Sequence, residues 1–88
     1  MLKKGNRDKF DSIEEFVDNL ERGGEVEFIY NKKNYSITRP NGLICFMEVG
    51  NEASEVIFNK VNELLEYEIE NQKIRDIITY IEPYFRCF

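Results

Sequence analysis

Histidine and tryptophan are both absent from this sequence of 88 residues. Histidine is the commonest general base near neutral pH and the commonest protein ligand of transition metals, so most enzyme sites depend on it. A serine or cysteine nucleophile activated by histidine is excluded for the same reason. We therefore expect a protein that is not an enzyme and that uses no cofactor and no metal.

Cysteines and long apolar runs are also scarce. The two cysteines, Cys45 and Cys87, have neither the spacing of a metal-binding pair nor that of a redox motif. We expect one buried thiol and one thiol near the chain end, with a disulfide between them as the alternative. No apolar run approaches the ~18 residues that cross a bilayer, and the chain start lacks the apolar segment of a signal peptide. A cytoplasmic protein without membrane contact is expected.

Basic residues are outnumbered, because 17 acidic and 12 basic residues give a formal net charge of −5. This balance disfavours nucleic acid as a partner, since binding to phosphates depends on clustered Lys and Arg. An acidic surface keeps the protein soluble and could steer it toward a basic protein partner. The length predicts a single domain over residues 1–88, either a monomer or a weak homodimer.

The first part of the chain predicts one amphipathic helix. Residues 1–9 are polar and basic and indicate a flexible start. Ser12 and Glu15 have the spacing of a capping box, in which the side chain of each residue accepts a hydrogen bond from the backbone N–H of the other. Gly23-Gly24 can adopt the left-handed backbone conformation that ends a helix. Apolar residues recur at helical spacing at Ile13, Phe16, Val17 and Leu20. The outer face carries Glu14, Asp18 and Glu21.

Residues 25–47 organise the chain, because they predict three strands joined by two tight turns. Alternation in the first strand indicates that Val26 and Phe28 face the core. In the second strand Tyr35 and Ile37 do so, while Ser36 and Thr38 are expected to face outward. The two connections are expected at 31–34 and at the Arg39-Pro40-Asn41-Gly42 turn.

Residues beyond the second turn are expected to complete the sheet. Residues 43–47 are uniformly apolar, which favours a central strand or one covered on both faces. Residues 48–54 predict a polar loop. The β-branched pair Val56-Ile57 favours a fourth strand over residues 55–58.

The C-terminal third has helical periodicity in two apolar stripes. Polar residues between the stripes favour two short helices with a turn at residues 70–72, one long helix being the alternative. Asn59 can cap the first helix, and Pro83 is expected to end the last. The predicted fold class is therefore α+β, with an N-terminal helix, a four-stranded antiparallel β-meander and two short C-terminal helices packed on one face.

Residues 84–88 form an aromatic tail that contains too many aromatic side chains for an ordinary frayed end. The tail either folds back onto the domain or stays exposed and meets a partner. The acidic outer face of the first helix is the other candidate contact surface. The candidate residues for protein contact are Tyr84, Phe85, Phe88, Glu14, Asp18 and Glu21.

Three further groupings are better explained as solvated surface than as chemical sites. Glu25 and Glu27 share a strand face but alternate with core residues. The oxygen-rich stretch 48–55 does not have the spacing of an EF-hand loop. Lysines 32 and 33 lie near tyrosines, as in some RNA-binding sheets, but the acidic balance of the chain opposes that function.

The order of residues in the first hairpin, EVEFIYNKKNYSI, resembles small uncharacterised proteins of Gram-positive bacteria and their phages. In those proteins an acidic amphipathic helix precedes E-[IV]-E-F-x-Y-N-G-K-x-Y-S-I, and two helical segments follow, here residues 58–65 and 69–81. Lys32 stands in place of the glycine, which disfavours a two-residue hairpin turn. The resemblance implies no activity and carries over no functional residues.

Two hypotheses for function follow from these observations. The leading one is a non-enzymatic protein-interaction module of bacterial or phage origin that binds through its acidic surface or its aromatic tail. The alternative is a phage inhibitor of a host defence nuclease that imitates nucleic acid with clustered carboxylates. The second hypothesis requires that six residues share one face: Glu14, Asp18, Glu21, Glu63, Glu66 and Glu70.

Overall fold

The computed structural model describes residues 9–87, with Glu82 and residues 84–87 described by their backbone alone. The expected flexible start lies almost wholly outside these residues. The elements, in order, are α1 (Ile13–Glu21), β1 (Glu25–Tyr30), β2 (Lys33–Thr38), the 3-10 turn η2 (Pro40–Gly42), β3 (Ile44–Glu48), β4 (Asn51–Phe58), α2 (Val61–Leu65), β5 (Glu68–Ile69), β6 (Gln72–Lys73), α3 (Ile74–Ile77) and β7 (Glu82–Cys87).

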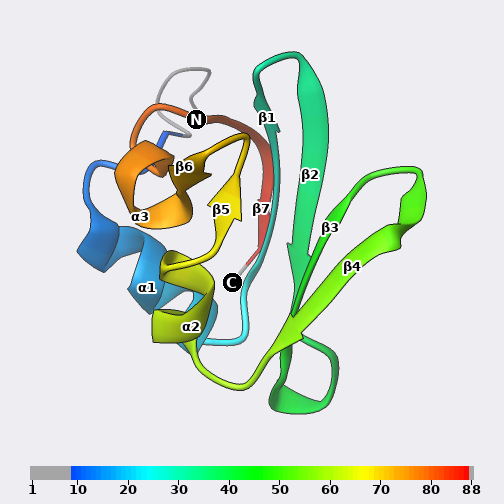
Figure 1. Cartoon of the computed structure of the whole chain (residues 1–88). Coiled ribbons are helices and arrows are strands. Elements are labelled where there is room, and N and C mark those ends of the chain that lie inside the picture. Colours follow the sequence, from blue (N-terminus) through cyan, green and yellow to red (C-terminus); the bar gives the residue numbers. More distant parts are fainter. Residues whose placement is uncertain (1–8, 88) are drawn as a thin grey trace.

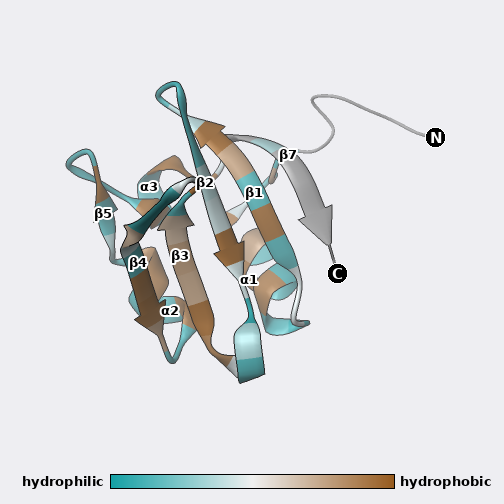
Figure 2. Ribbon diagram, turned by 90° about the vertical axis from the view of Figure 1, so that its right-hand side faces the viewer, coloured by the Kyte–Doolittle hydropathy of each residue, from teal (hydrophilic) through white to brown (hydrophobic). Residues whose placement is uncertain are grey.

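One antiparallel sheet has the strand order β4-β3-β2-β1-β7, and the helices cover one of its faces (Figure 1). Figure 2 views the opposite face of the sheet, with α1, α2 and α3 lying behind it. The predicted α+β fold, with an N-terminal helix, an antiparallel meander and short C-terminal helices, is confirmed. Strand β7 is a fifth strand that the periodicity of the sequence did not indicate.

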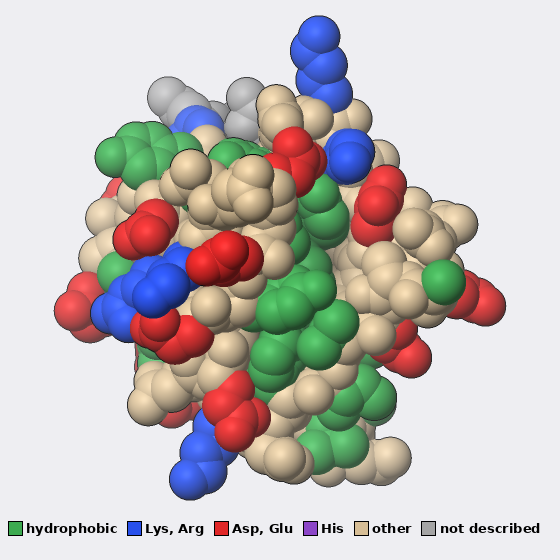
Figure 3. Space-filling view, in the orientation of Figure 1, with side chains coloured by type: hydrophobic (Ala, Val, Ile, Leu, Met, Phe, Trp, Pro, Cys, Tyr) green, Lys and Arg blue, Asp and Glu red, His purple; other side chains and the backbone are tan. Residues whose placement is uncertain are grey.

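The predicted amphipathic patterns fill the space between helices and sheet. The inward residues Val26, Phe28 and Ile37 have no exposed surface. Aromatic rings continue this core from strand to strand and onto the segment after α2, with ring centroids 5.5 Å apart for Tyr35–Phe46 and 5.6 Å for Phe46–Tyr67. Figure 3 shows hydrophobic side chains gathered in a band down the middle of the molecule in that view. Ser36, expected to face outward, is nevertheless buried.

Both ends of α1 form as the sequence predicts, with one change. The Glu15 N–H donates to Ser12 Oγ at 3.1 Å, but the returning bond comes from the Asp11 N–H to Glu15 Oε1 at 2.7 Å, not from the cap residue itself. Gly23 has φ +84° and ends the helix.

The first hairpin turn is tighter than expected. It contains only Asn31 and Lys32, with φ values of 54° and 68°, so the expectation that Lys32 disfavours a two-residue turn is wrong. These are the dihedrals of a type I′ turn, which suits the twist of a hairpin. The Asn31 side chain donates to Glu70 in the turn of the β5–β6 hairpin, and this contact helps to hold the left-handed backbone.

The expected polar loop at 48–54 is mostly strand, since β4 begins at Asn51. The register between β3 and β4 shifts between Phe46 and Glu48, which leaves extra residues on the β4 side. Ser54 makes this irregular stretch possible, because its Oγ accepts from the Glu48 N–H at 2.9 Å and donates to the Asn51 carbonyl at 2.6 Å. The polar composition of residues 48–54 predicted a loop. In the structure the Ser54 hydroxyl accepts the Glu48 N–H in place of a backbone carbonyl of the neighbouring strand.

The C-terminal third contains two short helices rather than one long one, and the predicted turn falls at Glu70-Asn71. The turn belongs to the β5–β6 hairpin, which the sequence did not indicate. Helix α3 ends at Ile77, so Pro83 does not end it; this proline lies in β7 and is buried. Within the expected aromatic tail, the backbone of residues 85–87 pairs with β1.

Arg39 ties the end of α1 to the connection between β2 and β3. Its guanidinium donates from Nε to the Leu43 carbonyl at 2.8 Å, from a terminal nitrogen to the Gly42 carbonyl at 2.9 Å, and from the other to the Leu20 carbonyl. The Leu20 carbonyl is among the last of α1, where it also accepts a hydrogen bond from the Gly23 N–H at 2.9 Å. A single cation therefore serves both the helix end and the turn.

Replacing Arg39 by Ala should lower the free energy of unfolding by about 2 kcal/mol, because hydrogen bonds to a charged group contribute about 1.5–3 kcal/mol and this side chain is only half-buried. Urea denaturation followed by circular dichroism measures the change. Lys60→Ala is the control, since Lys60 is exposed and should shift stability by less than about 0.5 kcal/mol. Equal stability of the two variants would contradict the role assigned to Arg39.

Asn19, on the sheet-facing side of α1, is fully buried, and neither atom of its amide group has a hydrogen-bond partner in the described part of the chain. Burial of an unsatisfied polar group costs about 1–3 kcal/mol. We expect Asn19→Ala to leave the free energy of unfolding unchanged or raise it by up to about 1 kcal/mol. The neighbouring Leu20→Ala should lower it by about 2–5 kcal/mol. A loss at Asn19 as large as that at Leu20 would show that its amide is satisfied.

Candidate functional site

A groove of about 370 Å³ runs along one side of α1, between this helix and the two C-terminal helices. Its α1 residues follow helical spacing, so they form one continuous wall. We call it the α1 groove. It is lined by Ile13, Glu14, Val17, Asp18 and Glu21 of α1, by Asn62 and Leu65 of α2, and by Arg75 of α3.

The floor of the α1 groove is apolar. Ile13 and Val17 are half-buried and pack against the core, and Leu65 on the opposite wall is 5% exposed. These side chains close the space beneath α1 while leaving part of their surface at the groove. Such a floor can receive an apolar side chain from another molecule.

The rim of the α1 groove is acidic. Glu14, Asp18 and Glu21 are all exposed and all line the groove, so the structure brings together the three acidic residues that the sequence indicated. Asp18 forms an exposed ion pair with Arg22 at 3.0 Å, one turn further along the helix. Among the described residues, neither Glu14 nor Glu21 has an ion-pair partner.

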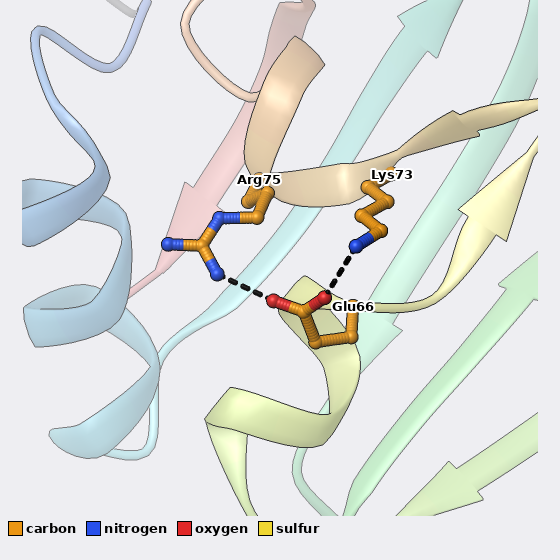
Figure 4. A network of polar contacts seen from close by, with 3 residues as sticks. All are labelled: Glu66, Lys73 and Arg75. Carbon is orange, nitrogen blue, oxygen red and sulfur yellow. Dashed lines mark hydrogen bonds and ion pairs between the residues drawn. The ribbon is translucent and has the colours of Figure 1, made fainter.

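Among the described residues, Arg75 contributes the one positive charge of the groove lining, and the Glu66 carboxylate offsets this charge. Figure 4 shows the Glu66 carboxylate held between two cations: Lys73 Nζ lies 2.8 Å from Oε1, and the Arg75 guanidinium contacts Oε2. The hydrogen bonds from Lys73 and then Arg75 lower the pKa of Glu66, and Glu66 in turn raises the pKa of Lys73. The groove therefore keeps a net negative charge.

A second hollow of about 460 Å³ adjoins the α1 groove and shares Glu21 and Asn62 with it. It lies beyond the C-terminal end of α1, where Arg39 contacts the Leu20 carbonyl. We call it the Arg39 pocket. Its remaining lining residues are Arg39, Ile44, Asn59, Lys60 and Val61.

The aromatic side chains predicted for protein contact cannot be placed relative to the groove. Tyr84 and Phe85 belong to β7, where Phe85 lies opposite Glu27 of β1. Their side chains, and all of Phe88, lie outside the described residues. Sequence reasoning missed the residues of the second wall, which are Asn62, Leu65 and Arg75. The sequence predicted the helices that carry these residues, but not that these helices face α1.

Glu70 is used within the fold. Its carboxylate accepts hydrogen bonds from Asn31 and, at 3.3 Å, from the Tyr35 hydroxyl, and it lies 3.8 Å from Lys33 Nζ. Burial, and then the charge and hydrogen bond of Glu70, raise the pKa of Tyr35 to about 12. These contacts clasp the tip of the β1–β2 hairpin to the β5–β6 hairpin.

The other groupings form no comparable site. Glu25 and Glu27 are half-buried on β1. Cys45 is a buried free thiol that donates to Glu55 at 2.9 Å, and burial followed by this hydrogen bond raises its pKa, so the thiol stays protonated at neutral pH. Within residues 9–87 there is no group of three or more potential metal ligands, and no helix of that part has the length and apolarity to cross a membrane.

Comparisons with known proteins identify no relative: no family model, no curated protein and no solved structure matches the chain. The geometry of the described residues is therefore the basis for assigning a function.

Replacing Arg75 by Met should raise the pKa of Glu66, because one of the two cations that stabilise its carboxylate is removed. A lowered folded-state pKa means that Glu66 contributes stability above its unfolded pKa and loses it as the pH falls through the folded value. Carboxyl-detected NMR titration of Glu66 in the two proteins measures the shift. An unchanged pKa would show that Arg75 does not hold Glu66 in solution.

Proposed function

We propose that this protein is a non-enzymatic interaction module that binds a cationic, amphipathic segment of another protein in the α1 groove. The observation that carries this proposal is that three carboxylates of one helix line a groove whose floor is apolar. An apolar side chain of the partner occupies the floor between Val17 and Leu65. Lys or Arg side chains of the partner lie against Glu14, Asp18 and Glu21.

The chemistry of the groove explains why a cationic segment fits better than a neutral or acidic one. An apolar anchor buried on Ile13, Val17 and Leu65 gains about 25 cal/mol for each Å² removed from water. The exposed carboxylates add only about 0.2–1 kcal/mol each, but they exclude acidic partners and accelerate encounter. Docking of an amphipathic helix into such a groove is a recurring mode of peptide recognition.

The nuclease-inhibitor hypothesis receives less support from the arrangement of carboxylates. Imitation of a phosphate backbone requires unpaired charges spread along one face. Glu66 is bound to Lys73 and Arg75, and Glu70 is bound to the β1–β2 hairpin. Glu63 accepts backbone N–H groups from Asn59 and Lys60, at 3.0 and 3.3 Å. Of the six carboxylates, Glu14 and Glu21 have no hydrogen-bond or ion-pair partner among the described residues, and both line the α1 groove, which favours a short cationic partner.

A labelled peptide of about five helical turns, with Leu on one face and Lys on the other, tests this function by fluorescence anisotropy. We expect saturable binding that weakens as salt rises from about 50 to about 300 mM, because the rim charges are exposed. The same peptide with Glu in place of Lys should not bind.

Neutralising the rim in the triple variant Glu14→Gln, Asp18→Asn, Glu21→Gln should weaken binding about tenfold, since three exposed attractions are lost together. The matched control, Glu27→Gln, Glu52→Gln, Glu68→Gln, changes the net charge equally at residues outside the groove lining and should bind as the wild type does. Equal weakening in both variants, or no binding of the Lys peptide by the wild type, would refute the proposed function.

A further inference from the structure

We infer that the α1 groove and the Arg39 pocket form one continuous docking site that selects a partner segment with basic residues at one end and acidic residues at the other. This inference rests on the proposed function and specifies the partner of the same site. It adds that charge order along the segment, not net positive charge alone, determines how the segment binds.

Continuity comes from the two shared lining residues. Glu21 is the last residue of α1 and Asn62 lies in the first turn of α2, and both line both hollows. From Glu14 to Glu21 the groove follows about 10 Å of helix. The Arg39 pocket then extends the path past the helix end, with Ile44 and Val61 as buried apolar lining.

The two ends of this path have opposite charge. At the α1 end the rim carries Glu14 and Asp18, and the charge of Arg75 in the same lining is offset by its ion pair with Glu66, as that of Asp18 is in part by Arg22. At the other end the lining carries Arg39 and Lys60 against the single carboxylate of Glu21. The Arg39 hydrogen bonds all go to neutral carbonyls, and no carboxylate of the described residues pairs with Arg39 or Lys60. Both positive charges are thus available to an acidic group.

Opposed charges at the ends of one groove fix the direction of an elongated ligand. A segment whose basic end lies at Glu14 and whose acidic end lies at Lys60 gains attraction at both ends, whereas the reversed placement meets repulsion at both. Like-charge contacts suppress wrong registers more strongly than attractive contacts raise affinity.

Three labelled peptides that share one set of helically spaced Leu residues test this inference. One carries Lys on all polar positions, one carries Lys in its first half and Glu in its second half, and one has the same composition with Lys and Glu alternating. We expect the block peptide to bind about fivefold or more tightly than the alternating peptide. A spin label at its basic end should broaden amide signals near Glu14, and a label at its acidic end should broaden those near Lys60.

Lys60→Gln should abolish most of the preference for the block peptide and leave the affinity for the all-Lys peptide unchanged or higher. Lys32→Gln, at an exposed hairpin tip, is the matched control and should preserve the preference. If the all-Lys peptide binds in the α1 groove but block and alternating peptides bind equally, this inference is wrong while the proposed function stands. If no peptide binds, both are wrong.

Discussion

The position of β1 at the interior of the sheet is the constraint on which the rest of the fold depends. β1 pairs with β2 on one side and with β7 on the other, and its residues Val26 and Phe28 are fully buried beneath the helices. A slip of one residue in either pairing would turn these side chains to the opposite face, so the register is strongly specified. Because α1 joins β1 through Gly23-Gly24, this register also determines where α1 lies and hence where its groove is.

Local patterns predicted the elements of this fold well and their partners less well. The Ser12 cap and apolar stripe of α1 and the alternation of Val26 and Phe28 are features of a few neighbouring residues, and the structure confirms them, although Glu15 accepts from the Asp11 N–H. β7 is different, because its sequence lacks the alternation of apolar and polar residues that is typical of a strand. It forms by pairing with β1, which lies far away in the sequence. The left-handed turn at Asn31 and Lys32 is likewise held by the hydrogen bond from the Asn31 side chain to Glu70, 39 residues away in the sequence. The α1 wall of the groove could be predicted from the exposed face of that helix. The second wall belongs to α2 and α3, and the sequence periodicity does not specify how these helices pack against α1.

The distribution of paired and unpaired charges connects the fold with the proposed function. Glu66 and Glu70 stabilise the fold. Glu66 pairs with Lys73 and Arg75, and Glu70 connects the β5–β6 hairpin with the β1–β2 hairpin. Glu14 and Glu21, by contrast, stabilise no described contact of the chain and lie beside an apolar floor. Part of the acidic charge thus serves the fold and part lies unpaired at the α1 groove, and this distribution is more informative about a partner than the net charge of −5.

Chemical-shift mapping tests the central claim, that the α1 groove is where a cationic segment binds, most directly. The measurement follows backbone amide signals of the ¹⁵N-labelled protein as the Leu/Lys peptide is added. The account predicts that the largest shifts fall in α1 and α2 and around Arg75, and that the outer face of the sheet, including Ile57 and Met47, is unaffected. Shifts concentrated on that outer face, or spread evenly over the surface, would contradict it.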